Sequence, residues 1–416
     1  MAVSKKKRRL RVGNFIVFLS GIILLIVMTF IIIYFNSKNY DKNTLSLGVS
    51  PTPIKAVLLT EQCDDSILTS SSTVDFSNFT QNTSYYQYLK PQDIYSKSAL
   101  VINKTTNEII FEKNADTLCY PASTTKILTS VVALEYINPD TVFTVGDELD
   151  LVPADSSLAY ITVGENIPLK DLLYGLMLPS GNDVGYTIAV NVARRVSNNP
   201  NMSNSDAVKY FSNLMNQTAK KIGMENSNFV VPDGFHDPQH YVTTRDMMKL
   251  LIYAQNFDLL KQIASTYEYK YKSNLKEFDW FNSNRLLDKS SEFYYEGVTG
   301  FKTGFHDDAG HCVAITCNKN GVELYIVLMN AESMIYRNRD TINLLNMVYN
   351  PSAIKLGLQW DLKPGETLPQ GVDVYGNPIV TTASSDINAN TIVTTIQPQI
   401  YIDENGNIVT STVKGF

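Results

Sequence analysis

Cysteine and histidine are both scarce in this chain. Its 416 residues include four cysteines and four histidines, and four cysteines are too few for a fold of this size that depends on disulfides. No histidine stands in an HExxH or HxH pattern, so a zinc peptidase is disfavoured and no metal site is expected. Each cysteine is expected to be a small buried apolar residue, and the pattern leaves open any pairing among Cys63, Cys119, Cys312 and Cys317.

Acidic residues are missing from the first 12 positions, which hold six lysines and arginines. The rest of the chain carries 29 basic residues (35 minus 6) against 41 acidic ones, a net charge of −12. A nucleic-acid-binding surface needs the opposite balance, because Lys and Arg neutralise the phosphates. Nucleic acid is therefore not an expected partner.

The segment after the basic cluster lacks charge altogether. Phe15 to Phe35 is 21 residues without a charged side chain, long enough as a helix to cross the ~30 Å of a bilayer's hydrocarbon core. Tyr34 to Lys38 offers no small-x-small cleavage site, which favours an uncleaved anchor over a signal peptide. Because a Lys/Arg excess stays on the cytoplasmic side, we expect residues 1–12 to be cytoplasmic and 13–35 to cross the cell membrane once, in contact with its lipids. The remainder would be extracellular.

Beyond the anchor, the composition predicts three regions. Residues 36–92 are rich in Ser, Thr, Asn and Gln and read as a mostly irregular polar linker. Residues 93–350 run from strand-like to helical and back to strand-like patterns, which is typical of an α+β fold whose antiparallel sheet is built from both ends of the domain. Residues 351–416 contain short β-type runs between Pro and Gly turns and are expected to form a small β module.

Within residues 93–350, the spacing of apolar residues predicts individual elements. Two runs around a polar turn at 99–111 indicate a β-hairpin, and Asn320-Gly321 indicates another near the end of the domain. Helices are expected to begin near residue 123 and to cover 169–178, 183–195, 207–218 and 245–254.

Three short motifs combine residues that can do chemistry. Ser123-Thr124-Thr125-Lys126 puts a hydroxyl and an amine on one face at a helix start. Ser180-Gly181-Asn182 lies in a break between two predicted helices, and Lys302-Thr303-Gly304 lies on a predicted strand, where the glycine lets a ligand's backbone lie alongside. Each motif alone has an ordinary structural reading: a helix cap, a turn and a protected edge strand.

In the order SxxK, SxN and KTG, the three motifs resemble those of the serine penicillin-recognising enzymes. Within this group the chain more closely resembles the low-molecular-weight penicillin-binding proteins, the serine D-alanyl-D-alanine carboxypeptidases. It covers about residues 92 to 350 and includes the stretches 171–183, 240–246, 284–287 and 309–312. The resemblance implies a β-lactamase/DD-peptidase-like fold, with an antiparallel sheet flanked by helices and a helical subdomain.

The resemblance also implies a role for each motif residue. Ser123 is the expected nucleophile, Lys126 its general base, and Ser180 the relay of a proton to the leaving amine. For Lys126 to act as a base near neutral pH, burial and the nearby Lys302 cation must lower its pKa. Asn182 would hold a substrate amide.

On the side of the KTG motif, the resemblance implies recognition of a terminal carboxylate. Lys302 and Thr303 would contact it, next to Gly304, and the backbone N–H groups of Ser123 and Phe305 would bind the oxyanion. An arginine further on serves the same carboxylate in some members of the family. Arg337 is the best match here, and Arg339 is its competitor.

The implied reaction is removal of the last D-Ala from a peptidoglycan stem peptide through an acyl-enzyme, with β-lactams acylating the same serine and no metal or organic cofactor. A β-lactamase is disfavoured because no glutamate stands between Asn182 and Glu225. An endopeptidase acting on cross-links, and a non-hydrolysing penicillin-binding receptor or wall-binding module, stay open. This chain has His306 after Phe305, where members of the family usually have a threonine. The fine substrate preference of the family is therefore not carried over to this chain, whereas the core chemistry is unaffected. The C-terminal region is short for the family and lacks an amphipathic helix.

Overall fold

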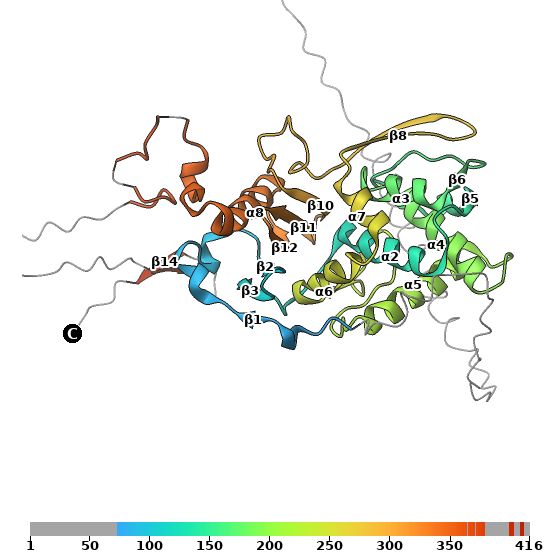
Figure 1. Cartoon of the computed structure of the whole chain (residues 1–416), viewed down its shortest axis with the longest axis horizontal. Helices are drawn as coiled ribbons and strands as arrows, with labels where there is room; N and C mark the ends of the chain where they lie inside the picture. The colour runs from blue at the N-terminus through green and yellow to red at the C-terminus, as the bar shows by residue number, and fades with distance from the viewer. Residues whose placement is uncertain (1–72, 364, 371, 379–398, 403–407, 412–416) are drawn as a thin grey trace, which may run out of the picture. The chain divides into compact units, whose positions relative to one another are not determined.

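The computed structural model describes residues 73–363, 365–370, 372–378, 399–402 and 408–411. Its largest sheet has six strands in the order β1-β3-β2-β12-β11-β10 (Figure 1). Neighbouring strands are antiparallel except β1 and β3, which are parallel. The strands are β1 Thr80–Gln81, β2 Ser98–Asn103, β3 Glu108–Lys113, β10 Val298–His306, β11 Gly310–Lys319 and β12 Val322–Ala331.

Both predicted hairpins are present in this sheet. β2 and β3 pair across the polar turn that the sequence indicated. β11 and β12 are joined at Asn320 and Gly321, whose φ angles of 53° and 78° are both positive. This is the backbone of a two-residue hairpin turn, which Asn and Gly adopt at low cost and whose twist matches that of the strands. β2 then pairs with β12, so both ends of the domain contribute to one sheet.

The sheet is buried on both faces. Leu100 and Ile102 of β2 belong to a core cluster shared with the helices before β10, whereas Ala99 and Val101 belong to a second cluster that includes α8. Because successive side chains of a strand point to opposite faces, this alternation shows a sheet covered by helices on each side, which confirms the α+β prediction. The helices are α2 Lys126–Tyr136, α3 Leu169–Met177, α4 Asn182–Val196, α5 Asn204–Lys221, α6 Thr244–Ala254, α7 Asp258–Ser265 and α8 Met334–Tyr349.

The remaining strands of the described residues form four two-stranded pairs. They are β4 Leu118–Cys119 with β7 Val242–Thr243, β5 Val142–Thr144 with β6 Asn166–Pro168, β8 Glu268–Lys272 with β9 Glu277–Phe281, and β13 Gln399–Ile402 with β14 Ile408–Ser411. The last pair lies in the C-terminal region, where the sequence indicated short β-type runs. Helix α7 and the β8–β9 hairpin had no counterpart in the sequence prediction.

Part of the predicted linker folds onto the sheet. Residues 80–81 form β1 beside β3, and Leu89 is fully buried. The predicted membrane anchor at 13–35 and Cys63 lie outside the described residues. Within the part of the chain that the structure describes, no helix is long and apolar enough to span a bilayer.

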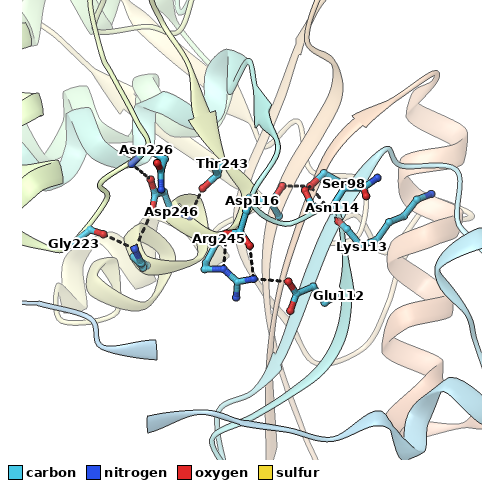
Figure 2. Close-up of polar contacts among 12 residues, drawn as sticks. Ser98, Glu112, Lys113, Asn114, Asp116, Gly223, Asn226, Thr243, Arg245 and Asp246 are labelled. Carbon is cyan, nitrogen blue, oxygen red and sulfur yellow. Dashed lines mark hydrogen bonds and ion pairs between the residues drawn. The ribbon is translucent and has the colours of Figure 1, made fainter. Parts of the chain in front are cut away.

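A polar cluster fastens the helical region to the sheet (Figure 2). Arg245, in the first turn of α6, donates from Nε and Nη2 to the two carboxylate oxygens of Asp116 at 2.7 and 2.9 Å, and also pairs with Glu112 of β3. One residue on, the Asp246 carboxylate accepts from the Asn226 N–H at 2.8 Å and from Lys249 Nζ at 3.0 Å. The Arg245 bonds fix the start of α6 against β3 and the turn after it, and the bond from Asn226 to Asp246 fixes it against the segment after α5.

Candidate active site

The turn that carries Ser123 has a constrained backbone. Ala122–Thr125 form the 3₁₀ turn η5, and Ala122 has a φ of 47°, in a region that alanine rarely adopts. The Ala122 carbonyl lies against Gly234, where a Cβ would come within 1.9 Å of the carbonyl oxygen. Only glycine fits at position 234, and this close approach holds the turn on which Ser123 sits.

Helix α2 follows the turn and places the fully buried Lys126 beside Ser123. Lys126 Nζ lies 2.8 Å from Ser123 Oγ, 2.7 Å from Asn182 Oδ1 and 2.8 Å from the Asp233 carbonyl oxygen. Burial lowers the pKa of Lys126 to about 8, although the Asp233 and Asp183 charges oppose this. A neutral amine would donate its two hydrogens to the two carbonyl-type oxygens, and its lone pair would then face the Ser123 hydroxyl.

Ser180 lies between α3 and α4 in a strained conformation. Its φ is 66°, its side chain is buried, and among the described residues its hydroxyl has no hydrogen-bond partner. An unpaired buried hydroxyl costs about 1–3 kcal/mol, and such costs concentrate at functional sites. Two residues on, Asn182 contacts Lys126 and donates from Nδ2 to Ser156 Oγ at 3.0 Å. The SxN motif therefore meets the SxxK motif, as expected.

Strand β10 brings the third motif to the same turn. A Cβ on Gly304 would lie 2.9 Å from the Pro121 carbonyl oxygen and 3.1 Å from the Ser123 nitrogen, so the missing side chain lets strand and turn touch. Lys302 is buried, and its one hydrogen bond within the described part of the chain is to the Thr303 carbonyl oxygen, at 3.1 Å. Burial, followed by the charges of Lys126 and Arg337, lowers the pKa of Lys302 well below its ordinary value.

The structure separates the two candidate arginines of α8. Arg337 is buried, and its Nε and Nη2 donate to Asn338 Oδ1 at 3.2 and 3.0 Å. Its charge acts on Lys302, and burial lowers its own pKa to about 10. Arg339 instead pairs with Asp361 at 2.6 Å, over the ring of Trp360. Arg337 is therefore the arginine on the Lys302 side, and Arg339 fastens the segment after α8.

Several contributors to the site come from loops that carry no motif. The Asp233 carbonyl accepts from Lys126, and Ser283 Oγ lies 2.7 Å from Thr303 Oγ1. His240 Nε2 lies 2.8 Å from Thr125 Oγ1, and burial lowers the pKa of His240 to about 3. This neutral ring supports η5, the turn that carries Ser123 and is called the nucleophile turn below. All three residues lie within the range of the resemblance, but of the three only His240 falls in one of its named stretches, 240–246. No sequence pattern predicted the contacts themselves.

The other predicted residue, Phe305, follows Gly304 on β10 and is exposed. Its side chain is 54% exposed, and its ring stacks on His311 with centroids 4.3 Å apart. The structure thus brings Ser123, Lys126, Ser180 and Asn182 together on the helical side and Lys302, Thr303, Gly304, Phe305 and Arg337 on the side of β10.

Comparison with known proteins agrees with this geometry. The family model described as D-alanyl-D-alanine carboxypeptidase matches residues 85–333. The D-alanyl-D-alanine carboxypeptidase of Streptomyces sp. strain K15 is 30% identical over 258 residues, which cover 59% of this chain and 84% of that protein. The D-alanyl-D-alanine carboxypeptidase DacF of Bacillus subtilis is 25% identical over 260 residues, 61% of this chain and 62% of DacF. The chain therefore spans less than two thirds of the length of DacF.

Two further similarities bear on the fold and the activity. The crystal structure of the Streptomyces K15 DD-transpeptidase superposes with a TM-score of 0.57 at 28% identity, covering 62% of this chain and 97% of that one. A D-alanyl-D-alanine endopeptidase of Pseudomonas aeruginosa is 27% identical over 57% of this chain and 72% of its own length.

The fold and the Ser–Lys pair define a serine hydrolase in which a buried lysine stands beside the serine. The family match extends over most of the described domain. The chain belongs to the D-alanyl-D-alanine carboxypeptidase family of peptidases.

Proposed function

We propose that this protein removes the terminal D-Ala from peptidoglycan stem peptides by acylation of Ser123. The Ser123 hydroxyl gives its proton to neutral Lys126 while Oγ attacks the carbonyl carbon of the penultimate D-Ala. The backbone N–H groups of Ser123 and Phe305 stabilise the oxyanion. The C–N bond then breaks, Ser180 passes a proton to the leaving nitrogen, and free D-Ala departs. Water hydrolyses the ester and restores Ser123.

The observation that carries this proposal is a pair of buried cations without a carboxylate. Lys302 and Arg337 are 1% and 3% exposed, and among the described residues neither forms an ion pair. Burying a charge without a partner costs several kcal/mol. An anionic group of the substrate would supply that partner, and a free C-terminal carboxylate next to the scissile bond has the right charge and size.

Penicillin binding and membrane attachment belong to the same proposal. A β-lactam carries a carboxylate beside a strained amide, so it fits the cations around Lys302 while its ring carbonyl meets Ser123. The charge-free run at 13–35 and the basic residues before it support a single-pass anchor in the cell membrane with the enzyme outside. That placement would expose the site to the cell wall.

An endopeptidase is the second candidate, because one relative carries that name. A cross-link can also carry a free carboxylate next to the scissile bond, so the same two cations would serve both reactions. A non-hydrolysing receptor would acylate Ser123 and stop there.

The test compares substrates on the purified full-length chain in detergent. A peptide ending in D-Ala-D-Ala should release free D-Ala with many turnovers, and Ser123→Ala should release none. A cross-linked peptide dimer, assayed in parallel, should be cleaved more slowly. Faster cleavage of the dimer would favour the endopeptidase, and a single turnover would favour the receptor.

A further inference from the structure

Two histidines and a carboxylate converge beside the active site although they lie far apart in the sequence. His306 ends β10, Asp308 lies in the turn to β11, and His236 lies two residues after Gly234. One ligand atom from each of the three lies within 4.8 Å of the others. His236 Nδ1 and Asp308 Oδ2 are 3.4 Å apart, and the two imidazole rings have centroids 5.1 Å apart at 73°.

The donor set and spacing suit a transition-metal ion. Zinc takes His nitrogens and Asp oxygens at about 2.0–2.2 Å, which puts the ligands of a tetrahedral ion ~3.3 Å from one another. The His236–Asp308 pair already has that spacing, and the third ligand must move inward by up to ~1.5 Å, from the 4.8 Å limit to ~3.3 Å. Imidazole and carboxylate together select ions of the zinc class over calcium or magnesium, which prefer oxygen alone.

One existing hydrogen bond works against the ion. The Ala309 N–H donates to His306 Nδ1 at 3.1 Å. A neutral ring that binds metal through Nε2 carries its proton on Nδ1, so this hydrogen bond must open first. The loss lowers the affinity by roughly tenfold at most. The site is therefore expected to be reversible rather than a permanent structural site.

We propose that His236, His306 and Asp308 form a site for a divalent transition-metal ion such as Zn²⁺, with a fourth position open to water. The ion would join two segments that hold the nucleophile turn. One is the loop whose Gly234 lies against Ala122, and the other is strand β10, whose Gly304 lies against Pro121. Tyr120 already contacts both histidine rings, with centroid distances of 5.0 and 5.9 Å. The inference does not depend on the proposed function, because it concerns metal binding beside the active site and not the chemistry at Ser123.

The test is calorimetric titration of Zn²⁺ into untagged, metal-stripped full-length protein in detergent. We expect one ion per chain, a higher unfolding temperature with Zn²⁺, and reversal by a chelator. Co²⁺ at the same site should give the visible absorption bands of a four-coordinate ion. His236→Ala and Asp308→Asn should each weaken binding at least tenfold.

Two matched variants make the test specific. Asp307→Asn changes an exposed acid in the same turn, and His311→Ala removes a partly exposed imidazole outside the triad. Both should keep the Zn²⁺ affinity within about twofold. Asp308 is 61% exposed, so Asp308→Asn should fold normally. Equal affinity in wild type and Asp308→Asn, or loss only in His311→Ala, would overturn the assignment.

Discussion

Lys126 and Lys302 are equally buried, yet their surroundings differ. Lys126 contacts three oxygens, and the Asp233 and Asp183 charges act to raise its pKa against the effect of burial. Among the residues that the structure describes, Lys302 contacts one carbonyl, and the charges of Lys126 and Arg337 lower its pKa beyond the effect of burial. These two equally buried lysines therefore differ in the role that their surroundings favour.

The difference follows from the elements that surround each lysine. On the helical side, the amide of Asn182 and the carbonyl of Asp233 orient the amine of Lys126, so that it can exchange a proton with Ser123. On the side of β10, Lys302 and Arg337 create a positive potential that no described carboxylate neutralises. The first arrangement suits a base, and the second suits a binding site for an anion.

The largest effect is expected when Lys126, the proposed base, is replaced by a residue that cannot accept a proton. Lys126→Met removes the amine and Lys126→Arg keeps the charge but cannot act as a base near neutral pH. Both should slow acylation by about 10²–10⁴-fold. Stopped-flow measurement with a fluorescent penicillin checks this. If Lys126→Arg keeps more than a tenth of the rate, another residue is the base.

Arg337→Ala tests the anion-binding side. Charge-assisted hydrogen bonds are worth about 1.5–3 kcal/mol, so D-Ala release from a peptide acid should slow by roughly ten- to a hundredfold. The corresponding peptide amide should lose little, because it has no carboxylate. Arg339→Ala is the matched control, since Arg339 pairs with Asp361. If Arg337→Ala slows cleavage of the peptide acid and of the peptide amide equally, Arg337 has a structural role. If only Arg339→Ala slows cleavage of the acid selectively, Arg339 is the residue that binds the carboxylate.

The pH dependence should follow Lys126. Its pKa of about 8 lies below that of a lysine in water, and only the neutral amine accepts the proton of Ser123. Acylation should therefore rise with pH, reach half its plateau near pH 8, and be ~tenfold below the plateau at pH 7. Asp233→Asn removes a charge that raises the pKa of Lys126, so it should move the midpoint to lower pH. A midpoint that shifts upward, or does not shift, would contradict this account of Lys126.

The smallest effect is expected at Ser283. Its hydroxyl lies 2.7 Å from that of Thr303, so Ser283 would position Thr303 without touching substrate. Ser283→Ala should raise KM for the peptide acid about fivefold, the worth of one neutral hydrogen bond, and Ser283→Thr should restore it. Ser290→Ala, which removes a hydroxyl bound to Asp288, should leave KM unchanged. A drop in kcat alone would show that Ser283 does not act through binding.

What the sequence predicted well was local. The β2–β3 hairpin, the Asn320-Gly321 turn and the three motifs each depend on residues within a few positions of one another. The α+β prediction also held, because the order of strand-like and helical patterns decides which layers can form. The role of each motif residue came from the resemblance and not from its spacing.

What the sequence could not predict depends on contacts between distant segments. Nothing near Asp233 indicates that its carbonyl accepts from Lys126, and Ser283 stands outside any motif. Arg337 and Arg339 differ only by two positions on one helix, so packing decides which of the two charges acts on Lys302. His236 and His306 meet only because the nucleophile turn packs against both segments, which a search for histidine spacing cannot detect.

The central claim is that Ser123, activated by Lys126, carries the acyl group. The most direct measurement is to incubate the full-length chain with benzylpenicillin, digest it, and locate the added mass by peptide sequencing in the mass spectrometer. We predict one adduct per chain, on Ser123, and none in Ser123→Ala. An adduct on Ser180, or undiminished labelling of Ser123→Ala, would contradict the account.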